Sequence, residues 1–147
     1  MRCLIIVFCL AAFANPVFAQ GKTQFDIDDL RWRHRVLIVF AADSTQKFAE
    51  PLLNQIERYQ SDFLDRDMVF IGIFSNASNH VDGQFLNELS IKKLKARFGA
   101  GTSSFRVLLI GKDGGVKLDQ QVSTDLNDIF ALIDTMPMRR SEMKQKG

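Results

Sequence analysis

Three adjacent polar residues, Asp43, Ser44 and Thr45, follow the apolar run at 36–41, and Arg106 stands at the start of a later apolar run. The first run leads into a helical pattern, and the free N–H groups at the start of a helix attract anions. A carboxylate, two hydroxyls and a guanidinium at such a junction could hold an anionic ligand or assist a nucleophile. The plainer alternatives are that Ser44 or Thr45 caps the helix and that Arg106 pairs with Asp43 or caps a carbonyl group.

The N-terminal residues have the pattern of a signal peptide. A short positive start precedes the apolar run Cys3–Phe13, and Val17–Ala19 fits the small-residue cleavage pattern. The run is shorter than the roughly 20 residues that span a bilayer as a helix. We therefore expect residues 1–19 to be removed and the chain to be exported without a stable membrane anchor. In a Gram-negative bacterium the destination would be the periplasm, and otherwise the protein would be secreted.

Removal of residues 1–19 from the 147 also removes both cysteines, Cys3 and Cys9. The remaining 128 residues then contain no thiol nucleophile, no disulfide and no thiolate metal ligand. His34 and His80 are the only histidines, and two histidines without cysteine make a poor zinc set. We expect no metal and no cofactor. The formal net charge of +2 for the full chain argues against a nucleic-acid partner.

The spacing of apolar residues predicts the strands and helices that position these residues. Continuous apolar runs predict interior strands at 36–41 and 68–74, and a Gly-rich turn at 111–115 predicts a hairpin of two further strands. Helical spacing predicts three helices between and after them: 48–63, 90–98 and a last helix ending before Pro137. This order predicts an α/β thioredoxin-like fold, with a central mixed sheet of about four strands flanked by helices. Residues 20–138 form the domain, and the basic residues 139–147 form a flexible tail.

Several helix ends are also predicted. Pro51 favours a helix that begins near Glu50 or is kinked there. Ser90 is expected to cap the second helix, which Gly99 ends, and Ser123 or Thr124 is expected to cap the last one.

Two local patterns resemble those of peroxiredoxins. Residues 41–48 align with the peroxiredoxin pattern Pro-x-x-x-Thr-x-x-Cys, in which Thr45 matches and Phe48 stands in the place of the reactive cysteine. Arg106, at the start of a strand that leads into a Gly turn, stands in the place of the peroxiredoxin arginine. The Cys-x-x-Cys pattern of thioredoxins is absent from the sequence. The resemblance implies a shared fold and not a shared activity.

Three longer segments, residues 30–41, 109–118 and 129–140, resemble the family called domain of unknown function 4174. Its members are small exported bacterial proteins and the terminal domains of some animal matrix proteins of the sushi-repeat kind. The resemblance implies a thioredoxin-like or peroxiredoxin-like domain that lacks the catalytic cysteine. It implies no particular reaction.

Three functions are consistent with these observations. The main hypothesis is an exported, redox-inactive thioredoxin-like domain that binds an unknown protein or a small anionic ligand. It carries no thiol oxidoreductase or peroxidase activity. The first alternative is a cysteine-independent enzyme or anion-binding pocket that uses Asp43, Ser44, Thr45 and Arg106. The second is an envelope- or matrix-associated structural protein. Trp32, inside the basic cluster at 31–35, either faces a partner or packs under the edge of the sheet.

Overall fold

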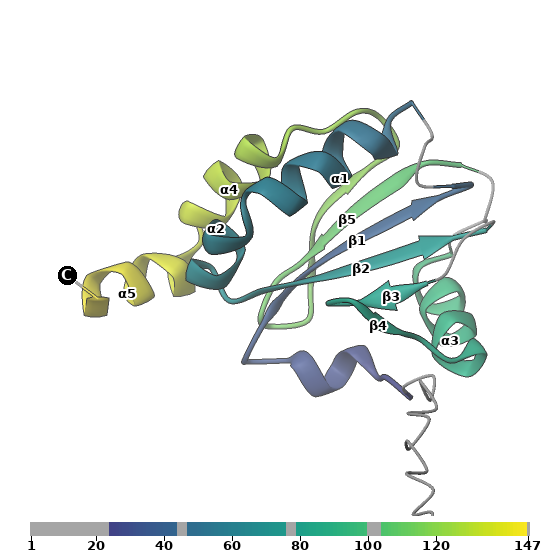
Figure 1. Cartoon of the computed structure of the whole chain (residues 1–147). Coiled ribbons are helices and arrows are strands. Elements are labelled where there is room, and N and C mark those ends of the chain that lie inside the picture. Colours follow the sequence, from purple (N-terminus) through teal and green to yellow (C-terminus); the bar gives the residue numbers. More distant parts are fainter. Residues whose placement is uncertain (1–23, 44–46, 76–78, 100–103, 147) are drawn as a thin grey trace, which may run out of the picture.

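The structure, a computed structural model, describes residues 24–43, 47–75, 79–99 and 104–146. Its centre is a sheet with the strand order β4-β3-β2-β1-β5-β6 (Figure 1). The strands are β1 (Arg35–Ala41), β2 (Met68–Phe74), β3 (His80–Val81), β4 (Gln84–Phe85), β5 (Arg106–Ile110) and β6 (Val116–Gln120). The four long strands are those predicted from the sequence. The two-residue strands β3 and β4 form a short edge hairpin in a segment where only a polar connection was expected.

The central strand β1 is buried along its whole length because both of its edges and both of its faces are covered. It runs parallel to β2, with Val36 opposite Val69, and antiparallel to β5, with Val36 opposite Ile110. A continuous apolar strand is the pattern expected for a sheet with helices on both faces. The predicted mixed sheet flanked by helices is therefore confirmed.

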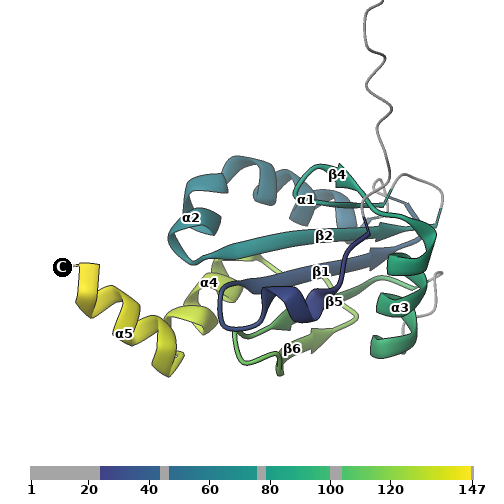
Figure 2. The same ribbon diagram turned by 90° about the horizontal axis from the view of Figure 1, so that it is seen from below.

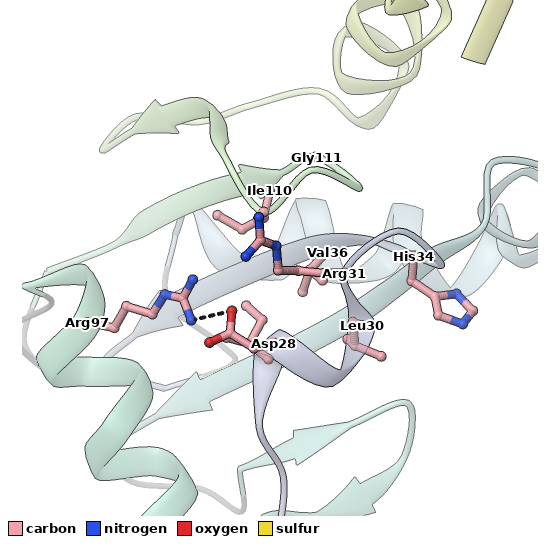
Figure 3. A pocket seen from close by; sticks show the side chains of 10 residues that line it. Asp28, Leu30, Arg31, His34, Val36, Arg97, Ile110 and Gly111 are labelled. Atoms are coloured by element: carbon pink, nitrogen blue, oxygen red, sulfur yellow. Dashed lines mark ion pairs between the residues drawn. The ribbon is translucent and has the colours of Figure 1, made fainter. Parts of the chain in front are cut away.

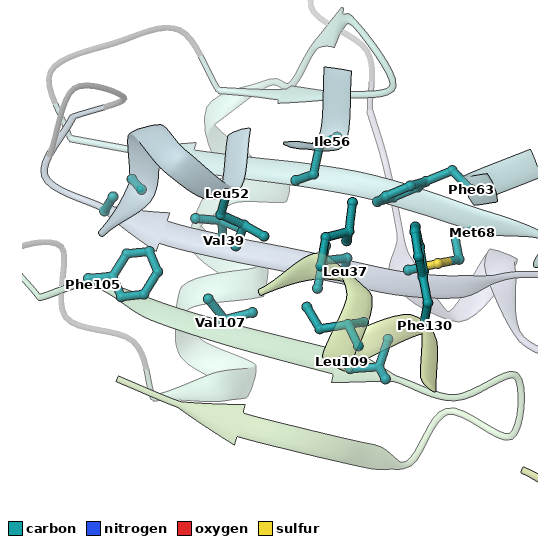
Figure 4. Close-up of a cluster of buried hydrophobic side chains, with 14 of the residues drawn as sticks. Leu37, Val39, Leu52, Ile56, Phe63, Met68, Phe105, Val107, Leu109 and Phe130 are labelled. Carbon is teal, nitrogen blue, oxygen red and sulfur yellow. The ribbon is translucent and has the colours of Figure 1, made fainter. Parts of the chain in front are cut away.

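Helices cover the two faces of the sheet unequally (Figures 1 and 2). The helical elements are η1 (Ile27–Leu30), α1 (Ala49–Arg58), α2 (Gln60–Asp65), α3 (Glu88–Phe98), α4 (Leu126–Asp134) and α5 (Pro137–Lys146). Side chains of α1, α2 and α4 pack on one face, where Leu37 and Val39 of β1 meet Leu52 and Phe130 (Figure 4). The other face is covered by η1 and α3. Successive strand residues therefore point to different helices.

Two features of the helix ends agree with the prediction, at Pro51 and Gly99, and three differ from it. Pro51 lies in the first turn of α1, where its missing N–H is tolerated, so the first of the two predicted alternatives holds. The predicted helix at 48–63 is divided at Tyr59 into α1 and α2. Asn87, and not Ser90, caps α3 by accepting a hydrogen bond from the Ser90 N–H, and Asp125 caps α4. Gly99, with φ of 60°, ends α3 as predicted.

The C-terminal segment is a helix in place of the flexible tail expected from its composition. α5 spans Pro137–Lys146, and its single buried residue is Arg139. The guanidinium of Arg139 pairs with Asp65 and Asp134, which lie on α2 and α4. Asp65, distant in sequence, and Asp134, on the preceding helix, thus hold the basic segment on the domain. Within the described part of the chain, no helix is long and apolar enough to cross a membrane.

Candidate functional site

An aromatic pair lies where β1 leads into α1. Phe48 occupies the N-cap position of α1 without forming a side-chain cap, and its ring lies 5.8 Å from that of Phe105. Phe48 is 37% exposed, whereas Phe105 is buried. Asp43 follows the end of β1, while the predicted site residues Ser44 and Thr45 lie outside the described residues. The centre of this junction is therefore occupied by apolar rings.

Arg106 lies on the other face of the sheet from α1. Its strand neighbours Phe105 and Val107 belong to the core under α1 and α4, so the side chain of Arg106 points toward α3. Its guanidinium donates two hydrogen bonds to Asp119, at 2.8 and 2.7 Å, and a third to the Phe98 carbonyl at the end of α3. These bonds from Arg106 lower the pKa of Asp119. The structure thus does not bring Arg106 to the start of α1.

A cysteine at Phe48 tests the alignment with the peroxiredoxin pattern. The N-terminal end of α1 should lower the pKa of a thiol there, and Lys47 adds a positive charge near the ring position. In a background with Cys3→Ser and Cys9→Ser, we expect Phe48→Cys to react with iodoacetamide at pH 7 about five times faster than Leu64→Cys. Leu64→Cys is the control because Leu64 is exposed but lies in the last turn of α2. Equal rates would contradict the alignment.

A concave site lies beside β2, and it was not predicted from the sequence. The groove has a volume of about 570 Å³ and lies between α1, α2 and the edge of the sheet at the β3–β4 turn. Its lining is mainly apolar: Leu53, Ile56, Phe63, Leu64, Met68, Phe70 and Phe74. Leu64 on its wall is 76% exposed. Pockets of 300–1,000 Å³ with such linings are typical small-molecule sites.

Among the described residues that line the groove, the ionisable ones, Glu57 and Asp82, are both acidic. Glu57 on α1 is exposed, and within the described residues it forms no ion pair. Asp82, at φ of 43° in the β3–β4 turn, uses one carboxylate oxygen to accept a hydrogen bond from the Phe70 N–H at 3.1 Å. The groove therefore combines an apolar floor with a negatively charged rim. The spacing of Glu57 from Leu53 on one helical face was the only signal for it in the sequence.

A buried ion-pair cluster joins two of the family-like segments, residues 30–41 and 109–118, to α5. Arg35 at the start of β1 is 1% exposed and donates two hydrogen bonds to Glu142 of α5. Lys112, in the β5–β6 turn, contacts Glu142 at 2.7 Å and Asp67 at 2.8 Å. Burial raises the pKa of Glu142, but hydrogen bonds from Arg35 and Lys112 outweigh it, so the pKa lies below its ordinary value. Each charge in this cluster has its partner, which indicates a structural role.

No metal centre emerges from the described residues, where no three His, Cys, Asp or Glu side chains are grouped to hold an ion. His34 lies next to β1 and His80 opens β3, in different parts of the fold.

The order of strands and the helices on both faces define a thioredoxin-like domain. Solved structures that share this fold include two peroxidases. One is the reduced 2-Cys peroxiredoxin of Plasmodium vivax, with a TM-score of 0.57, 12% identity and coverage of 78% of this chain and 84% of that one. The other is thioredoxin peroxidase I of Plasmodium yoelii, with a TM-score of 0.54, 14% identity and coverage of 78% and 79%. At these identities the likeness concerns the fold alone.

The chain belongs to the family described as domain of unknown function (DUF4174), whose model matches residues 26–142. This match confirms the resemblance carried by the three sequence segments. Among curated proteins no relative matches the chain.

Proposed function

We propose that this chain is an exported, redox-inactive thioredoxin-like domain that works as a binding module, and that its ligand occupies the groove beside β2. The observation that carries the proposal is the groove itself, an apolar concavity of about 570 Å³. The redox-inactive part rests on the sequence, because no cysteine follows Cys9. Phe48 and Phe105 occupy the junction where thioredoxin-like enzymes carry a reactive thiol.

The lining favours a small apolar ligand that carries a positive charge. When an apolar chain or ring covers the aromatic and aliphatic side chains of the floor, binding is favoured by about 25 cal/mol per Å² of apolar surface removed from water. The carboxylates of Glu57 and Asp82 on the rim complement a cation. An anionic ligand finds no cationic side chain among the lining residues that the structure describes. The small anionic ligand expected at Arg106 has no comparable support, because Asp119 and the Phe98 carbonyl occupy that guanidinium.

Two probes with the same alkyl chain test this function: decyltrimethylammonium, which is cationic, and 1-decanol, which is neutral. Both should bind the processed chain and raise its melting temperature, by an amount that grows with probe concentration. Leu53→Trp fills the groove and should weaken both probes at least tenfold. Glu57→Gln should weaken the cationic probe about threefold, as expected for an exposed ion pair, and leave 1-decanol unchanged.

Glu50→Gln is the matched control, because Glu50 is exposed on the same helix and is not among the described residues that line the groove. If Leu53→Trp binds both probes as tightly as the parent chain, the groove is not the site. Equal weakening by Glu50→Gln and Glu57→Gln would reject the cationic ligand class. Peroxide consumption by the processed chain above a protein-free control would reject the redox-inactive part.

A further inference from the structure

Trp32 is the most prominent side chain that neither the core nor the groove explains. It is the only tryptophan of the chain, and it is 63% exposed in the turn between η1 and β1. Its φ of 66° lies in the left-handed region, which bulky residues rarely adopt. Because the Trp32 ring is exposed, it does not pack under the edge of the sheet, which was one of the two alternatives left by the sequence. A strained backbone that presents a large ring to solvent is a reason to look for function.

The turn that carries Trp32 is held rigidly against the β5–β6 turn. The Trp32 N–H donates to the Lys112 carbonyl at 2.6 Å, and the N–H groups of Arg33 and His34 both donate to the Leu30 carbonyl. Arg31 donates to the Asp113 carbonyl at 3.0 Å. These contacts fix the backbone from which the indole ring projects. Two of the segments that carry the family resemblance thus form one surface, which we call the Trp32 surface: residues 31–33 and the turn 111–115.

Glycine at 114 permits the close approach of Arg31. A Cβ added at Gly114 would lie 2.9 Å from the Arg31 Nε, and φ at Gly114 is +82°. Figure 3 shows the Arg31 side chain extending toward Ile110 and Gly111, beside the Asp28–Arg97 ion pair. The hollow there is about 10 Å³, which is room for about one water molecule. A ligand must therefore meet this surface from outside.

The two arginines beside Trp32 keep their charges unneutralised. Arg31 and Arg33 donate to backbone carbonyls, of Asp113 and Asp29, and form no ion pair with a described carboxylate. The nearby Lys117 is by contrast paired with Asp113. The Arg31 guanidinium also lies 5.8 Å from the centre of the indole ring. The surface thus offers an exposed aromatic ring on a hydrogen-bonded turn that also carries two available guanidinium groups.

We propose that the Trp32 surface docks the domain reversibly on anionic phospholipid headgroups at a membrane surface. An indole has an apolar body and a polar N–H, and tryptophan accordingly prefers the boundary between water and lipid. Guanidinium groups bind phosphates in a two-pronged geometry. Exposed apolar side chains also lie near the same turn, at Val116 after it and at Met138, which lines a hollow with Lys112 and Lys117. One ring and two charges support weak, reversible binding.

The single tryptophan makes the test direct, because all indole emission comes from Trp32. Vesicles of phosphatidylglycerol should shift its emission to shorter wavelength, and vesicles of phosphatidylcholine should not. Phospholipids with brominated acyl chains should quench the shifted emission. Added salt should weaken the binding because it screens exposed charges. The variant Arg31→Gln/Arg33→Gln keeps the fluorophore and should bind phosphatidylglycerol at least tenfold more weakly, since each basic residue near an anionic surface contributes about fivefold.

Arg58→Gln/Lys92→Gln is the matched control, because it removes two exposed cations from α1 and α3. It should bind within twofold of the parent chain. All variants carry the same N-terminus, so any lipid contact of that segment is common to them. Trp32→Gly should lose vesicle cosedimentation without a lower melting temperature, because glycine adopts positive φ readily. Equal binding of the two double variants, or a shift only with dextran sulfate, would overturn the proposal.

Discussion

Replacing Glu142 with glutamine is expected to lower the free energy of unfolding by about 3 kcal/mol, the range seen when one partner of a buried ion pair is removed. Glu142 is 19% exposed and accepts hydrogen bonds from Arg35 and Lys112, which are both buried. Glutamine has nearly the same shape but no charge. The variant therefore leaves the guanidinium of Arg35 and the ammonium of Lys112 with less compensation inside the protein. Urea unfolding at pH 7, followed by circular dichroism, measures the difference.

Two controls separate this effect from the loss of any surface charge. Glu50→Gln removes an exposed carboxylate and should change the stability by no more than about 0.5 kcal/mol. Lys112→Met combined with Glu142→Gln should be less destabilising than the sum of the two single changes, because both partners are removed together. If Glu142→Gln costs less than about 1 kcal/mol, the cluster does not hold α5 on the domain.

The same cluster explains why the C-terminal segment was misjudged from the sequence. Residues 139–147 are rich in basic and polar side chains, and such composition is typical of solvated ends. Their partners lie far away in the chain: Arg139 pairs with Asp65, and Glu142 pairs with Arg35. Local pattern does not report such pairing. By contrast, β1 and β2 were predictable because a strand covered on both faces is continuously apolar.

The position of Arg106 shows how the candidate site could have been predicted more accurately. The residues that alternate along β5 toward α1 are Phe105, Val107 and Leu109, so Arg106 must face the opposite helix layer. Alignment to the peroxiredoxin pattern identified the strand but did not take this alternation into account. For the groove beside β2, the alternation of strand residues gives no signal, and the spacing of Glu57 from Leu53 marks only one of its walls. The groove depends on the β3–β4 turn, whose two-residue strands are too short to be recognised from sequence.

Acid should destabilise the domain sharply, and the largest part of the loss should come from the carboxylates that bind α5 or its partner Lys112. Hydrogen bonds from Lys146 and Arg139 lower the pKa of Asp65, and a hydrogen bond from Lys112 lowers that of Asp67. Burial raises the pKa of Asp134, but hydrogen bonds from Arg66 and Arg139 outweigh it and leave the pKa lowered. The pKa of Glu142 is lowered in the same way.

The direction of the pH dependence follows from these shifts. A carboxylate with a lowered pKa binds fewer protons in the folded state than in the unfolded state, so acid favours unfolding. The stabilisation should be fully present above the ordinary values of 3.8 for aspartate and 4.5 for glutamate, and it should disappear as the pH falls through the lowered folded-state values. Urea midpoints should therefore be nearly constant from pH 7 to about pH 5 and fall steeply below about pH 4.

Glu142→Gln tests whether this loss is centred on α5. The variant has one titrating group fewer in the cluster, so its stability should fall less steeply between about pH 5 and pH 3 than that of the parent chain. Its curve should approach that of the parent at low pH, where Glu142 is protonated in both states. Parallel curves at all pH values would place the acid sensitivity elsewhere. If the curves converge, protonation of Glu142 and its replacement by glutamine have the same consequence, and α5 depends on a charged carboxylate rather than on shape.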